Sequence, residues 1–208
     1  IDFLNYYARE EGRTFQLNPS RIERGVIGVI SPWNFPLAIP CGMISSALVA
    51  GNSVILKSAE QTPLIAQVLV DLLHESGVPE SALIHLPGQG ETVGDALVKH
   101  ERVASIVFTG SKAVGMSIIH HISQKSIYNR LRKLTVPKSV VAEMGGKNAV
   151  IVTANAELDE TVDGILYSAF GHSGQKCSAA SRIIVDLEIK DKLLERLKEA
   201  CSDLRVGV

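Results

Sequence analysis

The sequence holds few of the residues that metal sites and disulfide frameworks require. Only three of its 208 residues are cysteines, Cys41, Cys177 and Cys201, and none belongs to a CxxC pair. An odd number of widely spaced cysteines favours reduced thiols over a disulfide framework or a zinc site. The six histidines show no HExxH or similar ligand spacing, so no metal is predicted.

Charge of one sign and long apolar runs are scarce as well. The net charge is −1, so the chain offers no basic field for nucleic acid or for an anionic membrane. No apolar run reaches the roughly 18 residues that a membrane-spanning helix needs. Hydrophobic residues at 46% and charged residues at 21% are ordinary for a globular chain. We therefore expect no nucleic-acid partner and no membrane association.

Short β-rich runs alternate with longer helical patterns. Strands are predicted at 25–30, 53–57, 82–86, 103–109, 139–144, 149–152 and 182–185. Helices are predicted at 37–50, 62–76, 91–100, 111–126, 158–172 and 190–204, and the basic stretch 128–138 is predicted to be a solvated loop. Strands that alternate with helices indicate the α/β class, with a mostly parallel sheet covered on both faces.

Ligands of such sheets bind at the carboxyl ends of the strands, where loops lead into helices. The loop SPWNFP at 31–36 holds Asn34 between two prolines. A rigid Asn amide is a good oxyanion donor, although a proline-rich turn explains the same residues. In LKSAEQTP at 56–63, Lys57 and Glu60 could bind the hydroxyls of a nucleotide ribose or form a solvated charge pair.

Two glycine-rich loops follow later strands. PGQGETVG at 87–94 is one residue too long for a dinucleotide fingerprint, and it is predicted to be a tight loop before a helix. FTGSKAVG at 108–115 is a better phosphate candidate, because Gly110 and Ser111 precede a helix N-terminus that favours anions. Neither loop fits the P-loop pattern, which argues against an ATPase.

Two further residues could perform acid–base or nucleophilic chemistry. Glu143 follows a strand in AEMGGKNAVIV and could be a general base or an ordinary loop acid. Cys177 lies in the polar loop SGQKCSAASR beside Lys176, which suits a reactive thiolate. A free cysteine is also commonly just a small apolar residue of the core, so the residues alone leave both questions open.

The motifs PWNFP, LKSAEQTP, FTGS, E-x-GGK and GQ-x-C occur in this order from about residue 21 to the C-terminus. In this order and at these separations they resemble the aldehyde dehydrogenase superfamily. The resemblance implies its fold, a Rossmann-like open parallel sheet with the start of an α/β catalytic domain. It assigns residues 1–145 to an NAD-binding domain and 146–208 to the first part of the catalytic domain.

The resemblance also implies an NAD-dependent enzyme with Cys177 as nucleophile, Glu143 as general base and Asn34 as oxyanion-hole amide. A glutamate at position 60 suits ribose hydroxyls and disfavours a 2′-phosphate, so NAD is the expected cofactor. The family's cofactor contacts fall on Ile30, Ser31, Pro32, Trp33, Lys57, Glu60, Gly90, Phe108, Gly110, Ser111, Val114, Met144 and Gly145.

The stretches IDFLNYYARE, VAEMGGKNAVIV and SAFGHSGQKCSAASR are most similar to family members that oxidise glutamate γ-semialdehyde in proline catabolism. In those members the position of Ser178 helps to hold the substrate carboxylate, and Phe35 would line the aliphatic part of the substrate. The alternatives are a dehydrogenase for another aldehyde, such as succinate semialdehyde, and an NAD-binding module without catalysis.

Members of the family are longer than this chain, and their E-x-F-G-P segment is absent from it. We therefore expect a fragment of a longer enzyme, or of a bifunctional one with a proline dehydrogenase module, whose own turnover is doubtful. The complete enzyme is expected to act on a small-molecule aldehyde and to form a homo-oligomer. Its expected location is the bacterial cytoplasm, or the mitochondrial matrix in a eukaryote.

Overall fold

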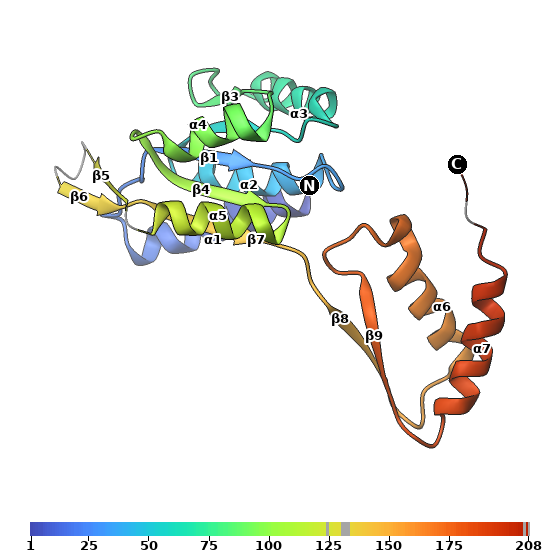
Figure 1. Ribbon diagram of the computed structural model, residues 1–208. Coiled ribbons are helices and arrows are strands. Elements are labelled where there is room, and N and C mark those ends of the chain that lie inside the picture. The colour runs from blue at the N-terminus through green and yellow to red at the C-terminus, as the bar shows by residue number, and fades with distance from the viewer. Residues whose placement is uncertain (124, 130–133, 206, 208) are drawn as a thin grey trace. The chain divides into compact units, whose positions relative to one another are not determined.

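The computed structural model describes residues 1–123, 125–129, 134–205 and 207 (Figure 1). The chain forms two compact units, Ile1–Met144 and Gly145–Val208. Each unit has its own apolar core. Whether the two units act as an NAD-binding domain and the start of a catalytic domain stays a prediction.

The first unit is built on a five-stranded parallel sheet. Its strands are β1 (Val26–Ile30), β2 (Ser53–Lys57), β3 (Leu83–His85), β4 (Val103–Thr109) and β7 (Ser139–Glu143). They lie in the order β3-β2-β1-β4-β7, and every neighbouring pair is parallel. The carboxyl ends of the strands therefore meet at one edge, as the predicted α/β class requires.

Helices cover both faces of this sheet. They are α1 (Asp2–Leu17), α2 (Ala38–Val49), α3 (Pro63–Glu75), α4 (Asp95–Lys99) and α5 (Lys112–Ile122). Apolar residues of α2 and α3 pack on β1, β2 and β3, and those of α4 and α5 pack mainly on β4. Val29, Ile44, Leu56 and Ile106 are fully buried between these layers. The predicted parallel α/β sheet is thus confirmed.

The local structure departs from the expected pattern at four places. The predicted helix 91–100 begins with a π-helical turn, η1 (Gly90–Gly94), before α4. Thr62 is the N-cap residue of α3, but its side chain makes no capping hydrogen bond, and its hydroxyl is buried without a partner among the described residues. α1 was not predicted, although its apolar residues repeat with helical spacing, and none of its residues is buried. The stretch 128–138 is not simply a loop, because β5 (Ser126–Asn129) and β6 (Leu134–Pro137) pair antiparallel within it.

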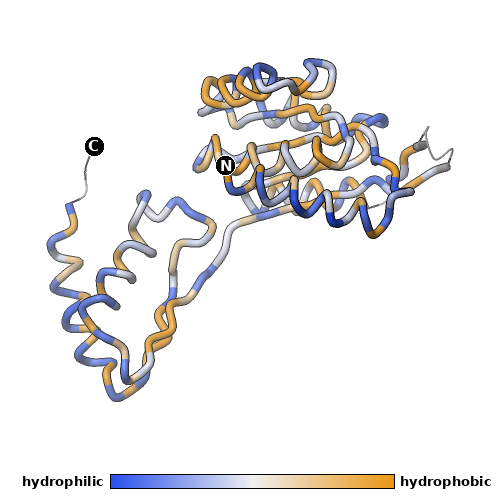
Figure 2. The backbone as a smooth tube through the Cα atoms, turned by 180° about the vertical axis from the view of Figure 1, so that it is seen from behind, coloured by the Kyte–Doolittle hydropathy of each residue, from blue (hydrophilic) through white to orange (hydrophobic). Residues whose placement is uncertain are grey.

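The second unit contains a two-stranded parallel sheet, β8 (Asn148–Val152) and β9 (Ala180–Val185). The helix α6 (Leu158–Phe170), the short 3-10 helix η2 (Gly171–Gly174) and α7 (Lys190–Ser202) complete it. One face of the strand pair packs on these helices, where Val152, Val162, Ile165 and Leu193 form the core. The C-terminal parts of both strands are apolar in Figure 2.

Within the ranges that the structure describes, no helix has both the length and the apolar character needed to cross a bilayer.

Candidate active site

The loops at the carboxyl edge of the first unit are joined by main-chain hydrogen bonds. The amide of Ser31, directly after β1, donates to the carbonyl of Lys57 at the end of β2 over 3.1 Å. The amide of Gly110, directly after β4, donates to the carbonyl of Glu143 at the end of β7 over 3.1 Å. The structure thus places four of the predicted residues at the ends of neighbouring strands.

Lys57 and Glu60 form an ion pair at this edge. The Lys57 side chain is only 4% exposed, and its Nζ lies 2.6 Å from Oε1 of Glu60, whose side chain is 41% exposed. The hydrogen bond from Lys57 lowers the pKa of the Glu60 carboxyl, with smaller contributions from the backbone of Glu60 and Gly90, while burial opposes the shift. A buried ammonium therefore holds an ionised, accessible carboxylate that can accept hydrogen bonds from hydroxyls.

The start of α5 presents a second candidate surface. Ser111 is the N-cap residue, and its hydroxyl accepts from the amide of Val114 over 3.3 Å. Ser111 and Val114 are exposed, whereas the ring of Phe108 is only 4% exposed. A Cβ on Gly110 would lie 2.7 Å from the Phe108 ring, so that glycine is needed for packing. The exposed helix N-terminus suits a phosphate.

The remaining predicted oxyanion, base and cofactor residues near the ends of the strands differ in their exposure. Asn34 and Phe35 are half-buried in the loop between β1 and α2, with Pro32 buried and Trp33 45% exposed. Ile30 and Met144 are half-buried, while Gly90, Glu143 and Gly145 are exposed. Gly145 begins the second unit, and the others belong to the first.

Cys177 and Ser178 are exposed residues of a turn in the second unit. The side-chain amide of Asn148, at the start of β8, donates to the carbonyl oxygen of Cys177 over 2.6 Å. A Cβ on Gly146 would lie 2.7 Å from the same oxygen, so that residue 146 has room only for glycine. The turn that carries the thiol is therefore fixed by the segment that follows Glu143.

The segment before Cys177 is strained. His172, Ser173 and Gly174 have φ values of 57°, 53° and 70°, which lie in the left-handed region. For residues other than glycine, this conformation costs on the order of 1–2 kcal/mol each. Strain of this kind is frequent where a functional loop is held in one shape.

A family comparison decides what these residues belong to. Residues 7–208 match the family model described as the aldehyde dehydrogenase family. The chain is an aldehyde dehydrogenase family member. The resemblance found in the motifs is thus confirmed, and the family's fold agrees with the parallel sheet described above.

Two curated relatives align with all of this aldehyde dehydrogenase chain. It is 42% identical over 222 residues to 1-pyrroline-5-carboxylate dehydrogenase of Bacillus cytotoxicus, with 41% of that protein covered. It is 45% identical over 207 residues to the bifunctional protein PutA of Klebsiella aerogenes, with 15% of that protein covered. The chain thus spans about two fifths of the first relative's length.

A solved structure shows the same fold. The crystal structure of 1-pyrroline-5-carboxylate dehydrogenase from Thermus with bound NAD superposes with a TM-score of 0.86 at 37% identity. The superposition covers 99% of this aldehyde dehydrogenase chain and 41% of that one.

Sequence reasoning overlooked Gly146 and Asn148 in this family member. The motif AEMGGKN was interpreted for its glutamate, Met144 and Gly145, yet its second glycine and its asparagine contact the Cys177 turn. The proposed neighbour of the thiol, Lys176, has a different role. Its ammonium donates to the carbonyl of Tyr167 over 3.1 Å and lies 4.9 Å from the centre of the Tyr167 ring, at the C-terminus of α6.

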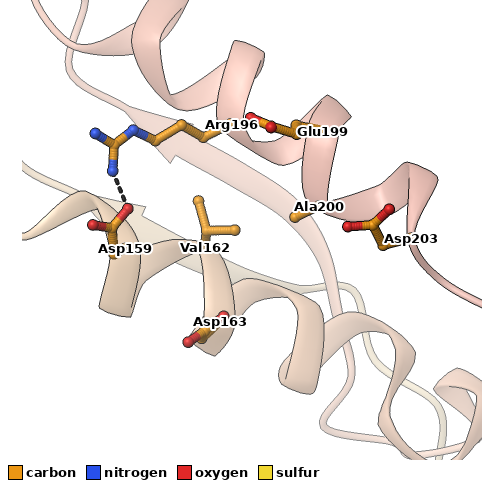
Figure 3. A pocket seen from close by; sticks show the side chains of 7 residues that line it. All are labelled: Asp159, Val162, Asp163, Arg196, Glu199, Ala200 and Asp203. Atoms are coloured by element: carbon orange, nitrogen blue, oxygen red, sulfur yellow. Dashed lines mark hydrogen bonds and ion pairs between the residues drawn. The ribbon is translucent and has the colours of Figure 1, made fainter.

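A hollow in the second unit of the aldehyde dehydrogenase chain lies apart from the predicted residues. Figure 3 shows that it lies between α6 and α7 and is lined by Asp159, Val162, Asp163, Arg196, Glu199, Ala200 and Asp203. The guanidinium of Arg196 pairs there with the carboxylate of Asp159. Across the described ranges, no group of three or more His, Cys, Asp or Glu side chains is placed to hold a metal ion.

Proposed function

We propose that this chain carries the cofactor site and the nucleophile of an NAD-dependent dehydrogenase that oxidises glutamate γ-semialdehyde to glutamate in proline catabolism. The observation that carries the proposal is the exposed Cys177 in a turn held by Asn148. It lies in a chain that aligns over its full length with 1-pyrroline-5-carboxylate dehydrogenase at 42% identity.

The residues of the first unit fit NAD. Glu60 is ionised and accessible beside a buried Lys57, as an acceptor for two ribose hydroxyls requires. The same carboxylate would repel a 2′-phosphate, which favours NAD over NADP. The exposed N-terminus of α5 at Ser111 offers amide groups to a phosphate. When bound, NAD supplies the acceptor for the hydride of the aldehyde.

The roles proposed for the side chains follow from their chemistry. The sulfur of Cys177, as thiolate, forms a bond to the aldehyde carbon, and the side-chain amide of Asn34 and the Cys177 amide donate to the resulting oxyanion. After the carbon has been oxidised to a thioester, Glu143 takes a proton from the water that releases the acid. Ser178 donates to the substrate carboxylate, and Phe35 contacts the aliphatic part.

The assignment of the substrate rests on the relatives, since their printed names specify 1-pyrroline-5-carboxylate. A dehydrogenase for another aldehyde, such as succinate semialdehyde, and a module that binds NAD without turnover are the competing functions. We further propose that the complete enzyme acts in the bacterial cytoplasm, since the relatives named above are bacterial. We also propose that it forms a homo-oligomer, as the family resemblance implies.

NADH formation tests the proposal. The 208-residue chain and a full-length version are compared with glutamate semialdehyde, succinate semialdehyde and propanal, and absorbance reports NADH. We expect the full-length protein to prefer glutamate semialdehyde. We expect Cys177→Ala to abolish turnover with NAD binding nearly unchanged, whereas Cys201→Ser, at the other exposed cysteine, should leave turnover intact. Turnover retained by Cys177→Ala would refute the nucleophile assignment, and preference for another aldehyde would refute the substrate.

A further inference from the structure

Four side chains form a continuous hydrogen-bonded chain beside the Lys57–Glu60 pair. The hydroxyl of Ser58 lies 2.9 Å from Nε2 of His85, and Nδ1 of His85 lies 2.7 Å from Oε1 of Gln67. The Nε2 group of Gln67 then donates to Oδ1 of Asp71 over 2.7 Å. Ser58 is only 1% exposed, while Gln67 and Asp71 lie on the surface of α3.

The chemistry of these groups fixes the direction of every hydrogen bond. A carboxylate only accepts, so Gln67 turns its NH₂ group to Asp71 and its oxygen to His85. The oxygen of Gln67 also only accepts, so the hydrogen of the neutral imidazole lies on Nδ1 of His85. Nε2 is therefore an acceptor, and the hydroxyl of Ser58 donates to it. Burial lowers the pKa of His85, against the opposing charge of Asp71, which favours this neutral form.

The chain of hydrogen bonds joins three elements at the cofactor edge. Ser58 directly follows Lys57 at the end of β2, His85 ends β3, and Gln67 lies on α3. Leu56 and His85 are register partners of the two strands. Because Ser58 lies between the members of the Lys57–Glu60 pair, its hydrogen bond fixes the backbone from which both side chains extend.

We propose that Ser58 and His85 are positioning residues that hold the Lys57–Glu60 pair in the geometry that binds the ribose of NAD, so that protonation of His85 weakens NAD binding. This inference rests on the proposed function, because it requires that the chain binds NAD. A proton on Nε2 makes that nitrogen a donor, so the Ser58 hydroxyl must rotate its hydrogen away from His85 and accept instead, which leaves this buried hydrogen without its acceptor. The charged groups near this chain of hydrogen bonds are Asp71 on α3 and the Lys57–Glu60 pair.

The dissociation constant of NAD tests the proposal without any turnover. Trp33 is the only tryptophan of the chain and lies 45% exposed in the loop after β1, so its fluorescence offers a probe, with calorimetry as a second method. Ser58→Ala removes one hydrogen bond and His85→Leu removes two, and we expect about three- to tenfold weaker NAD binding in each. His74→Leu is the matched control, since the ring of His74 bonds only to the carbonyl of Val78.

A pH series separates positioning from general damage to the fold. His85→Gln keeps an acceptor for Ser58 but cannot be protonated. Because burial lowers the pKa of His85, we expect the wild-type dissociation constant to rise as the pH falls below about 6.5, and that of His85→Gln to stay nearly constant. This comparison remains decisive even if His85→Leu fails to fold.

The outcomes separate the two proposals. If the wild-type chain binds NAD while Ser58→Ala and His85→Leu bind it equally well, only the positioning role is overturned. The positioning role is also overturned if the dissociation constant of NAD depends on pH in the same way for His85→Gln and for wild type. If the folded wild-type chain does not bind NAD at all, the proposed function fails together with the inference.

Discussion

The side-chain amide of Asn148 donates a hydrogen bond of 2.6 Å to the backbone carbonyl of Cys177. The two residues are 29 positions apart, and the contact closes the loop that contains α6. It explains why an asparagine follows the GGK motif, because a side-chain NH₂ group at the start of β8 reaches the turn that carries the thiol. The position of the proposed nucleophile thus depends on a residue without reactive chemistry of its own.

Asn148→Ala should reduce aldehyde oxidation by the full-length protein about ten- to hundredfold, since a small displacement of a reacting group can cost that much. Gly146→Ala should have a similar effect, because its Cβ would lie 2.7 Å from the Cys177 carbonyl oxygen. Steady-state kinetics check the loss. Asn155→Ala is the matched control, since Asn155 accepts only from Thr153 in the same unit. If Asn148→Ala and Gly146→Ala both keep the wild-type kcat/KM, Asn148 and Gly146 do not position the Cys177 turn.

Lys138→Met should destabilise the first unit by about 1–3 kcal/mol, because it leaves buried carbonyl groups without a donor. The ammonium of Lys138 donates to the carbonyls of Val98 and His100 over 2.6 and 3.0 Å, and the residue is 6% exposed. Urea unfolding monitored by Trp33 reports on this unit. The exposed Lys125 provides the control variant Lys125→Met. Equal stability of both variants would contradict the role of Lys138.

The same lysine predicts a dependence on alkaline pH. Burial, and to a smaller extent the charge of Lys125, lowers the pKa of Lys138 in the folded state. Between the lowered pKa and the unfolded value of about 10.4, the unfolded chain binds more protons, so this residue's contribution to stability rises with pH. The difference in unfolding free energy between wild type and Lys138→Met should therefore grow over that window. If this difference in unfolding free energy does not change with pH, the pKa of Lys138 is the same in the folded and unfolded states.

Glu60 predicts a dependence of the same sign at acid pH. Its hydrogen bond from Lys57 lowers the folded-state pKa, so its contribution is present above the unfolded value of about 4.3 and is lost as pH falls through the folded value. Glu60→Gln should therefore lose less stability than wild type on acidification, with Trp33 fluorescence in urea as the measurement. The side chain is 41% exposed, so the effect is small. If wild type and Glu60→Gln lose the same stability on acidification, the prediction is contradicted.

Regular elements of the core were predictable from local pattern. The predicted strands 53–57 and 103–109 coincide with β2 and β4, because their continuous apolar runs are buried on both faces. The antiparallel pair β5–β6 was missed because the basic residues of the stretch outweighed its β-branched ends, and 130–133 lie outside the described residues. α1 was missed although its apolar residues lie on one face, because its overall composition is polar.

The candidate site was predictable as a set of residues, but its supporting contacts were not. Sequence order places Lys57 and Glu60 after a strand, yet it does not show that the lysine is buried. Lys176 is next to Cys177 in sequence, while its ammonium contacts Tyr167, one turn before the end of α6. Ser58 and His85 are 27 positions apart, and only the register of β2 and β3 brings them together.

The uncovered face of the β8–β9 pair should make the second unit prone to self-association. Ile151 and Ile184 are direct cross-strand partners, and they are 73% and 55% exposed. Adjacent exposed isoleucines form an apolar patch of the kind that favours association.

The double variant Ile151→Thr, Ile184→Thr tests this role of the patch. It keeps β-branched residues while adding hydroxyls, so we expect a lower sedimentation coefficient at high protein concentration with the fold retained. Val152→Thr is the control, because Val152 is 3% exposed and its substitution should destabilise the core without reducing association. Association unchanged in the double variant would show that this face does not drive it.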